Sequence, residues 1–322
     1  MQRLFITYVC GFGFAFMLRL NAQDIERLDL RLDALVSPYA TVETLATGFN
    51  WTEGPVWDSR NQRLLFSNVP MNRIHTWVDA ETAVYMEPSG YTCGKDPGHT
   101  NIGSNGLAMD DEGRLIICRH GDRNVVRQEA DGFITVLADR WQGKRLNSPN
   151  DLTVHPSGDV YFTDPCFGLA GGKNSEDREI DVTGVYRIPV DGGELELVVD
   201  DLSPNGIVFA PDGKTLYITS DGKLMRCTRN EDGSLGERTL FFTLPEKGAF
   251  DGLTVDSLGN VYACNWKGGV FVIAPDGTHL GTIRTGHRTA NCIFGGEDGK
   301  TLFITSVSRL CRIAMKVTGA HQ

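Results

Sequence analysis

The sequence predicts an all-β protein, and more specifically a six-bladed β-propeller with four-stranded antiparallel blades. The main observation is a repeated hairpin, in which a β-prone run (152–154), a Pro/Gly/Asp turn (155–159) and a second β-prone run (160–163) follow one another. Six copies of this hairpin occur at intervals of roughly 40–55 residues, which is a period typical of propeller blades. Helical periodicity is almost absent from the repeated region.

Each copy contains enough strands for one blade. In the second copy, four runs are β-prone, at 105–110, 115–118, 125–127 and 134–137. The last copy ends near residue 315, and a strand-like run at 40–45 precedes the first copy. We therefore expect this N-terminal strand to complete the last blade, because closing the ring in this way removes an exposed sheet edge.

The first residues differ from the rest of the chain. Arg3 precedes an apolar run at 4–18, and small residues follow before Gln23, so residues 1–22 are predicted to be a secretory signal peptide. The apolar run is short for a membrane span, and an uncleaved anchor is the alternative. We therefore expect a periplasmic or secreted protein that is not attached to a membrane after cleavage.

One propeller domain is predicted to cover residues 23–322, with a short N-terminal extension at about 23–39. Within the extension, Ile25, Leu28, Leu32 and Leu35 have helical spacing, which predicts a short amphipathic helix over 25–35. No coiled coil or obvious apolar patch is present, so we expect a monomer or a weak homodimer.

Composition excludes several classes of protein. The 322 residues are 41% hydrophobic, which provides a sizeable core. The formal net charge of −10 argues against nucleic-acid partners, which require a basic surface, and is compatible with a site that collects a cation. The eight cysteines include no Cys-x-x-Cys pair, so we expect most of them to pack in the core.

One position of the repeat is a candidate for chemistry, namely the residue immediately before each first strand. Its side chain bears oxygen in every copy: Glu53, Asn105, Asn150, Asn205, Asp251 and Asn291. Because blades are arranged radially, these side chains should form a ring at one mouth of the central channel. Carboxylates and amides pack poorly in a core, but they suit a hard divalent cation. Ca²⁺ is our first expectation, and Zn²⁺ or Mg²⁺ could occupy a similar ring.

A simpler interpretation is that Asn-Gly and Asp-Gly are turn dipeptides. It explains the glycines after several of these residues. It does not explain Glu53-Gly54-Pro55 or Asn150-Asp151, and it does not predict an oxygen-bearing side chain in all copies. The metal ring is therefore the favoured interpretation.

Four motifs together resemble a known family: Glu53-Gly54-Pro55, Ser148-Pro149-Asn150-Asp151, Pro204-Asn205-Gly206 and Asp251-Gly252. They resemble the gluconolactonase, senescence-marker-protein-30 and luciferin-regenerating-enzyme family, and most of all its bacterial gluconolactonases. The resemblance covers about residues 40–315. It implies a single divalent metal ion held by Glu53, Asn150, Asn205 and Asp251, with Asn105 in contact with substrate.

The resemblance implies a metal-dependent sugar lactonase, which hydrolyses the lactone ester to the aldonic acid. The metal would act as a Lewis acid on the lactone carbonyl. Asp251 is the candidate for base or proton shuttle, and Glu53 is the second candidate. Asp151 is expected to orient Asn150 from behind.

Other polar residues are weaker candidates for the site. Asn150 and His99 are further candidates for substrate contact, and His99 belongs to a Gly- and Pro-rich insertion at 88–103 that could cover the site. A similar insertion lies at 165–181. His120 and Asp122 are expected to form a structural turn.

Two other functions remain open from the sequence. One is a related metal-dependent hydrolase of other lactones or of phosphoesters, because a metal ring does not name the substrate. The other is a non-catalytic binding propeller of the NHL type. Glu53 and Asp251 favour an enzyme, because a ring without catalysis has no need for two acids on the axis.

Overall fold

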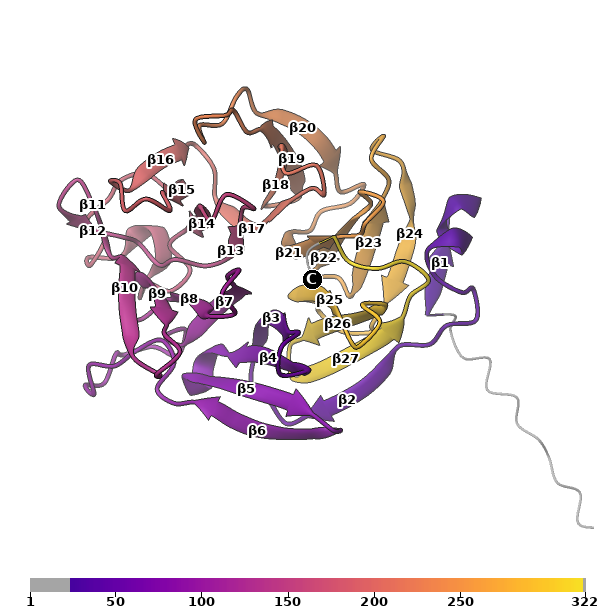
Figure 1. The fold of residues 1–322 in the computed structure, drawn as a ribbon, viewed down its shortest axis with the longest axis horizontal. Coiled ribbons are helices and arrows are strands. Elements are labelled where there is room, and N and C mark those ends of the chain that lie inside the picture. The colour runs from indigo at the N-terminus through magenta and orange to yellow at the C-terminus, as the bar shows by residue number, and fades with distance from the viewer. Residues whose placement is uncertain (1–23, 321–322) are drawn as a thin grey trace, which may run out of the picture.

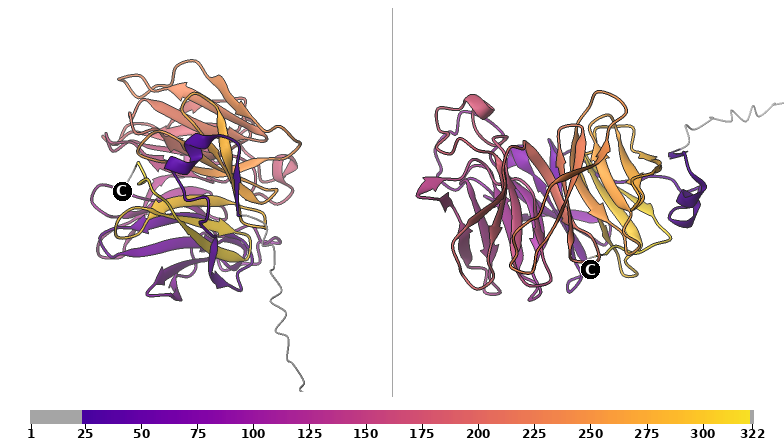
Figure 2. Two further views of the ribbon diagram at one scale, coloured as in Figure 1. Left: turned by 90° about the vertical axis from the view of Figure 1, so that its right-hand side faces the viewer. Right: turned by 90° about the horizontal axis from the view of Figure 1, so that it is seen from above.

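Six antiparallel sheets surround a central axis, and the chain visits them in sequence order (Figure 1). The computed structural model describes residues 24–320. Figure 2 shows the same sheets from the side, as a disc whose strands run between two faces. The predicted six-bladed β-propeller is therefore confirmed.

The first three blades lie within residues 52–199. Blade 1 contains β3 (Thr52–Asp58), β4 (Arg63–Asn68), β5 (Arg73–Val78) and β6 (Glu81–Met86). Blade 2 contains β7 (Ser104–Met109), β8 (Leu115–Arg119), β9 (Asn124–Gln128) and β10 (Ile134–Ala138). Blade 3 contains β13 (Leu152–Val154), β14 (Val160–Asp164), β15 (Gly184–Ile188) and β16 (Glu196–Val199).

The other three blades include both N-terminal strands. Blade 4 contains β17 (Pro204–Phe209), β18 (Thr215–Ser220), β19 (Lys223–Thr228) and β20 (Thr239–Thr243). Blade 5 contains β21 (Phe250–Val255), β22 (Val261–Asn265), β23 (Gly269–Ile273) and β24 (His279–Arg284), with β1 (Ile25–Arg27) as a fifth strand. Blade 6 contains β25 (Asn291–Gly295), β26 (Thr301–Ser306), β27 (Arg309–Ala314) and β2 (Glu43–Thr47).

A few short elements connect these strands. A small hairpin of β11 (Arg140–Trp141) and β12 (Lys144–Arg145) lies between blades 2 and 3. Three 3-10 helices are present, namely η1 (Leu30–Ala34), η2 (Val69–Met71) and η3 (Gly172–Asn174).

Local chemistry explains the hairpins, and aromatic packing joins the blades. The β13–β14 turn ends at Gly158, whose φ of 90° is a left-handed conformation that glycine adopts without a steric penalty. Between blades 3 and 4, the ring of Tyr161 contacts that of Phe209 edge to face at 5.1 Å. Between blades 1 and 6, Trp57 stacks on Phe303 at 5.5 Å. Burial of such rings between wedge-shaped blades holds the disc together.

The ring closes as the sequence predicted. β2 pairs antiparallel with β27, from Glu43 opposite Arg312 to Thr47 opposite Arg309, and so supplies the outer strand of blade 6. The strand begins and ends slightly later than the expected 40–45. Pairing the two ends of the chain in one sheet protects the edge of β27.

The predicted helix over 25–35 is wrong. Ile25–Arg27 instead forms β1 on the outer edge of β24, with Ile25 opposite Ile283. Only η1 follows, where the Asp29 carboxylate accepts the Arg31 amide at 2.9 Å. Ile25, Leu32 and Leu35 are buried against blade 5, whereas Leu28 is exposed. The segment pairs with the open edge of β24, and this pairing outweighs the helical spacing of its apolar residues. Figure 2 shows the segment on the outer rim.

Two further predictions concern the ends of the chain and the cysteines. The predicted signal peptide, residues 1–22, lies outside the described residues. Within residues 24–320, no helix is long and apolar enough to span a bilayer. Every described cysteine is a free thiol, and all except Cys93 are buried, as core packing requires.

Candidate active site

The six predicted oxygen-bearing residues lie at the same end of the innermost strands. Asn291 is the first residue of β25, Asn150 lies two residues before β13, and the other four are the second residues of β3, β7, β17 and β21. All six are buried, with exposures from 3% for Asn150 and Asp251 to 8% for Asn205. Backbone hydrogen bonds tie neighbouring blades together here, as from Gly106 N to Asn150 O at 2.7 Å. The structure therefore brings the predicted ring together.

Side-chain hydrogen bonds connect one half of the ring. Asn150 Nδ2 donates to Asn205 Oδ1 at 2.7 Å, and the Asn205 amide is in turn hydrogen-bonded to the Asp251 carboxylate. On the other side of Asn150, His120 Nε2 lies 3.1 Å from Oδ1. The sequence pointed to a structural turn at His120, yet its ring is 1% exposed and contacts a member of the ring.

The two acids of the ring are electrostatically coupled. Burial and the nearby Asp251 carboxylate raise the pKa of Glu53 well above its ordinary range. Burial also raises the pKa of Asp251 to about 7, against hydrogen bonds that lower it. Among the described residues, no Lys, Arg or His forms an ion pair with either acid. Two buried carboxylates without a cationic partner are costly, so the site favours a bound positive charge.

The donor set fits a hard cation only if the amides take part. Within residues 24–320, no three Asp, Glu, His or Cys side chains converge on one point. Glu53 and Asp251 supply negative charge, and Asn150 and Asn205 supply neutral carbonyl oxygens. Mixed carboxylate and amide oxygens are typical of Ca²⁺ sites. The residues present therefore fit a divalent ion, and they do not form a cysteine- or histidine-rich zinc site.

Two tryptophans hold the acids in place. Trp51 Nε1 donates to Glu53 Oε1 at 3.2 Å, and Trp266 Nε1 donates to Asp251 Oδ2 at 2.6 Å. The two indole rings contact each other edge to face, with centroids 6.5 Å apart. No sequence pattern pointed to either tryptophan, because both lie outside the repeated position. Trp51 comes two residues before Glu53, and Trp266 lies in the turn after β22.

Asp151 reaches across the channel instead of toward its neighbour. Its carboxylate accepts the Leu152 amide at 3.0 Å and Asn291 Nδ2 at 3.3 Å, and Asn291 comes from the opposite blade. Burial raises the pKa of Asp151 to about 7. None of its hydrogen bonds reaches the Asn150 side chain. Space for this bridge exists because Gly106 and Gly252 lack side chains where Asp151 and Asn291 lie.

The two insertions lie over the blade 2–blade 3 side of the ring. Asn101 Nδ2 in the first insertion donates to Phe167 O in the second at 2.6 Å. His99 is partly exposed and lies near enough to His120 to lower its pKa electrostatically, in addition to the larger effect of burial, which brings that pKa to about 4. The Asn105 side chain makes no hydrogen bond with any described residue, which leaves its amide available to a ligand.

A second ring of small polar side chains supports the first. The penultimate residue of each second strand is Ser, Thr or Cys: Ser67, Cys118, Thr163, Thr219, Cys264 and Thr305. Three of these hydroxyls donate to the backbone carbonyl of the ring residue in the next blade, as Thr219 Oγ1 does to Asp251 O at 2.6 Å. Alignment of the six copies at this position could have revealed the pattern.

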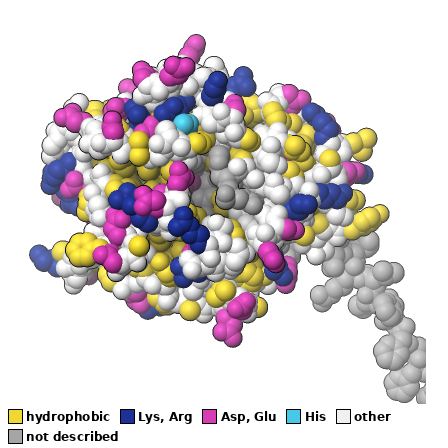
Figure 3. Space-filling model, in the orientation of Figure 1, with side chains coloured by type: hydrophobic (Ala, Val, Ile, Leu, Met, Phe, Trp, Pro, Cys, Tyr) yellow, Lys and Arg dark blue, Asp and Glu magenta, His cyan; other side chains and the backbone are white. Residues whose placement is uncertain are grey.

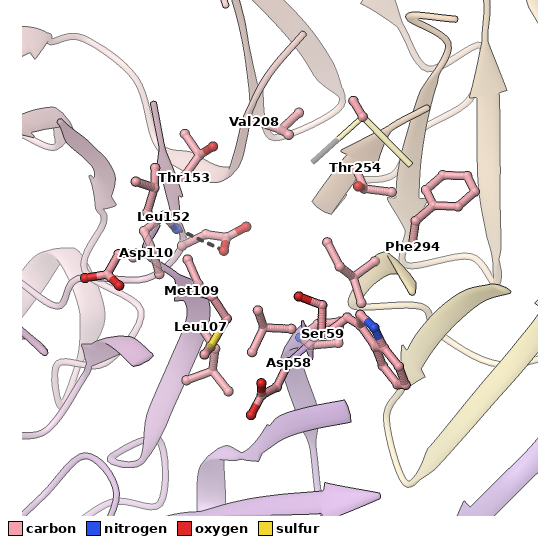
Figure 4. A pocket seen from close by; sticks show the side chains of 18 of the residues that line it. Asp58, Ser59, Leu107, Met109, Asp110, Leu152, Thr153, Val208, Thr254 and Phe294 are labelled. Atoms are coloured by element: carbon pink, nitrogen blue, oxygen red, sulfur yellow. Dashed lines mark hydrogen bonds between the residues drawn. The ribbon is translucent and has the colours of Figure 1, made fainter. Parts of the chain in front are cut away.

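The opposite mouth of the channel has a different character. A cavity of about 660 Å³ opens where the innermost strands end, and Figure 4 shows Leu107, Leu152 and Val208 around it. Asp151 and Asn291 line its inner end, so their bridge separates the cavity from the acidic ring. On the face viewed in Figure 3, acidic and basic side chains are interspersed. Asp58 and Asp110 also line this cavity, so the two mouths differ in that only the other one carries the buried ring of carboxylates and amides.

Comparisons with known proteins identify relatives over most of the chain. The family model described as the SMP-30/Gluconolactonase/LRE-like region matches residues 51–308. A gluconolactonase of Zymomonas mobilis is 34% identical over 312 residues, covering 92% of this chain and 87% of that protein.

Solved structures show the same architecture. A gluconolactonase of Xanthomonas campestris has a TM-score of 0.80 at 33% identity, covering 90% of this chain and 94% of that one. A calcium-binding regucalcin of Agrobacterium tumefaciens has a TM-score of 0.71, covering 87% and 95%. At 21% identity, this second likeness shows the fold alone.

Proposed function

We propose that this protein, which belongs to the SMP-30/gluconolactonase/LRE-like family, hydrolyses sugar lactones to aldonic acids. Relatives named gluconolactonase and pentonolactonase support this reaction class. The observation that carries the proposal is the pair of buried acids, Glu53 and Asp251, which face one channel mouth without a cationic partner among the described residues. A binding propeller has no need for this costly pair.

A divalent metal ion, with Ca²⁺ first and Zn²⁺ or Mg²⁺ as alternatives, fits the ring. Glu53, Asn150, Asn205 and Asp251 would hold it through carboxylate and amide oxygens. When bound, such an ion polarises a lactone carbonyl and stabilises the negative charge that develops on its oxygen. It also offsets the repulsion between the two acids.

The protein's own groups then position water and substrate. The Trp266 indole N–H holds Asp251 Oδ2, and the Asp251 carboxylate is the group that accepts a proton from the attacking water. Water adds to the carbonyl carbon, the ring C–O bond breaks, and the proton passes to the departing ring oxygen. The free Asn105 amide can donate to a substrate oxygen, and His99 is a second candidate contact on the insertion side. Glu53 is the alternative base.

The test is proton release from a panel of aldonolactones, with D-glucono-1,5-lactone as the first member. The protein should be assayed after chelation and after re-addition of Ca²⁺, Mg²⁺ or Zn²⁺. We expect metal-dependent acceleration over the uncatalysed rate. Asp251→Asn should abolish it while the circular dichroism spectrum stays unchanged. Acceleration that persists in Asp251→Asn would overturn the role of this residue, and no acceleration with any lactone or metal would overturn the proposed function.

A further inference from the structure

The side of the mouth formed by blades 5, 6 and 1 carries an aromatic and cationic group. The Trp266 and Trp51 rings contact each other edge to face there, and each donates its indole N–H to one acid of the ring. The Arg288 guanidinium lies over the Trp266 ring, 5.6 Å from its centroid. Trp266 therefore contacts both groups, Arg288 through its ring face and Asp251 through its indole N–H.

Apart from the Trp266 ring, the Arg288 guanidinium has no hydrogen-bonding or ionic partner among the described residues, and the side chain is exposed. Arg284, four residues earlier on β24, is instead paired with Glu26 at 2.7 Å. In a protein of net charge −10, an unpaired arginine beside an acidic site calls for a ligand with negative charge.

The turn that carries Arg288 is tightly built. Thr285 Oγ1 donates to His287 O at 2.7 Å and lies 2.9 Å from Thr289 Oγ1, which is fully buried. Ser306 Oγ from β26 donates to the Arg288 carbonyl at 2.8 Å. These bonds fix the backbone of Arg288 three residues before Asn291, so its side chain is presented at the rim of the ring. A cation held in this way loses less freedom on binding.

We propose that Arg288, carried on the Trp266 indole, makes the site selective for sugar lactones that bear a second, anionic group at the end remote from the lactone carbonyl. The inference rests on the proposed lactonase activity and names its substrate class. Phosphate, sulfonate and carboxylate share the chemistry required, because each offers oxygens for the paired N–H groups of a guanidinium.

The charges of the site also set the orientation of such a substrate. Glu53 and Asp251 repel an anionic group from the axis, and Arg288 attracts it to the rim. The lactone carbonyl then points inward to the ring, and the exposed part of Trp266, which is 40% exposed, lies beside the sugar carbons. Attraction at the rim and repulsion on the axis both favour one substrate orientation.

The experiment compares kcat/KM of the metal-loaded protein for D-glucono-1,5-lactone with that for its 6-phosphate, its 6-sulfonate analogue and a 6-carboxylate lactone. We expect a preference for at least one anionic lactone, and the ranking of the three identifies the anion. Arg288→Gln should lower the ratio of anionic to neutral kcat/KM by about tenfold, mainly through KM. The preference should also decrease with ionic strength, because an exposed charge pair is screened by salt.

The matched control is Arg284→Gln, which removes an exposed arginine of the same blade and should leave the ratio unchanged. Calorimetric binding of 6-phosphogluconate and of gluconate gives a readout that does not depend on turnover. If the protein hydrolyses lactones but Arg288→Gln leaves both the ratio and the two affinities unchanged, the selectivity inference is overturned and the lactonase stands. If nothing is hydrolysed but 6-phosphogluconate binds through Arg288, the anion site stands and the lactonase is overturned.

Discussion

Replacement of Thr219 by Val tests whether the ring of hydroxyls positions the acids. The Thr219 side chain is fully buried, and its hydroxyl has two partners. It donates to the carbonyl of Asp251 at 2.6 Å and accepts the amide of Gly206 at 2.7 Å, so it joins blade 4 to blade 5 directly behind the proposed base. Valine keeps the shape of threonine but has neither function.

The expected cost follows from the two groups left without partners. A buried donor or acceptor that loses its hydrogen bond costs about 1–3 kcal/mol, and we expect about 2–4 kcal/mol for Thr219→Val after partial relaxation. The measurement is urea unfolding followed by tryptophan fluorescence. We also expect kcat for lactone hydrolysis to fall by about tenfold, because the backbone of Asp251 loses a constraint next to the reacting groups.

Thr215→Val is the matched control, because Thr215 begins the same strand at the opposite face and its hydroxyl is bonded only to the exposed Asp212. Its unfolding free energy should change by less than about 0.5 kcal/mol, as is usual for a surface position. If Thr219→Val unfolds like this control and retains its kcat, the hydroxyl ring does not hold the acids.

Three further outcomes follow from other parts of the structure. Asp159 accepts the Val190 amide and the guanidinium groups of Arg187 and Arg229, which outweigh the effect of burial and hold its pKa at about 2. Since this folded pKa is depressed, Asp159→Asn should cost about 2 kcal/mol of unfolding free energy at pH 7, and the difference from wild type should vanish as pH falls from about 4 to 2. Gly252→Ala would place a methyl group 1.9 Å from Asn291 Cγ, so an unfolding titration should show a loss of roughly 1–3 kcal/mol or more. Adding Ca²⁺ to chelated protein at about 100 times its Kd should raise the unfolding free energy by about 2.7 kcal/mol, and a calorimetric scan that shows no such rise would argue against the metal ring.

The repeat made the fold and the ring predictable. A strand–turn–strand unit has a local signature, and radial symmetry converts one repeated position into one place in space. Ring closure was predictable for the same reason, because the sixth copy lacked a strand that residues before the first copy could supply. In contrast, β1 forms because the edge of β24 is open to pairing, and the spacing of apolar residues within 25–35 carries no information about that edge.

The residues outside the ring that contact its side chains were not predictable in this way. Trp266 and His120 lie just after second strands, in turns whose length and composition differ among blades, so a repeated position does not identify them. Asp151 differs for another reason. It occupies a position that is glycine in four of the other copies, and its long-range bond to Asn291 exists only because opposite blades meet at the axis.

The difference between the two channel mouths follows from where the repeat varies. The far ends of the innermost strands supply apolar side chains such as Leu107, Leu152 and Val208, which stabilise contacts between blades. At the near ends, the ring residue has an oxygen-bearing side chain in every copy. This side chain is a carboxylate in two copies, Glu53 and Asp251, and an asparagine amide in the other four. Glu53 and Asp251 repel each other at this mouth, and the buried Asp151 carboxylate of the Asp151–Asn291 bridge adds to the repulsion on both. If the proposed metal ion binds there, it offsets this repulsion, and metal affinity and fold stability are then coupled through the same two carboxylates.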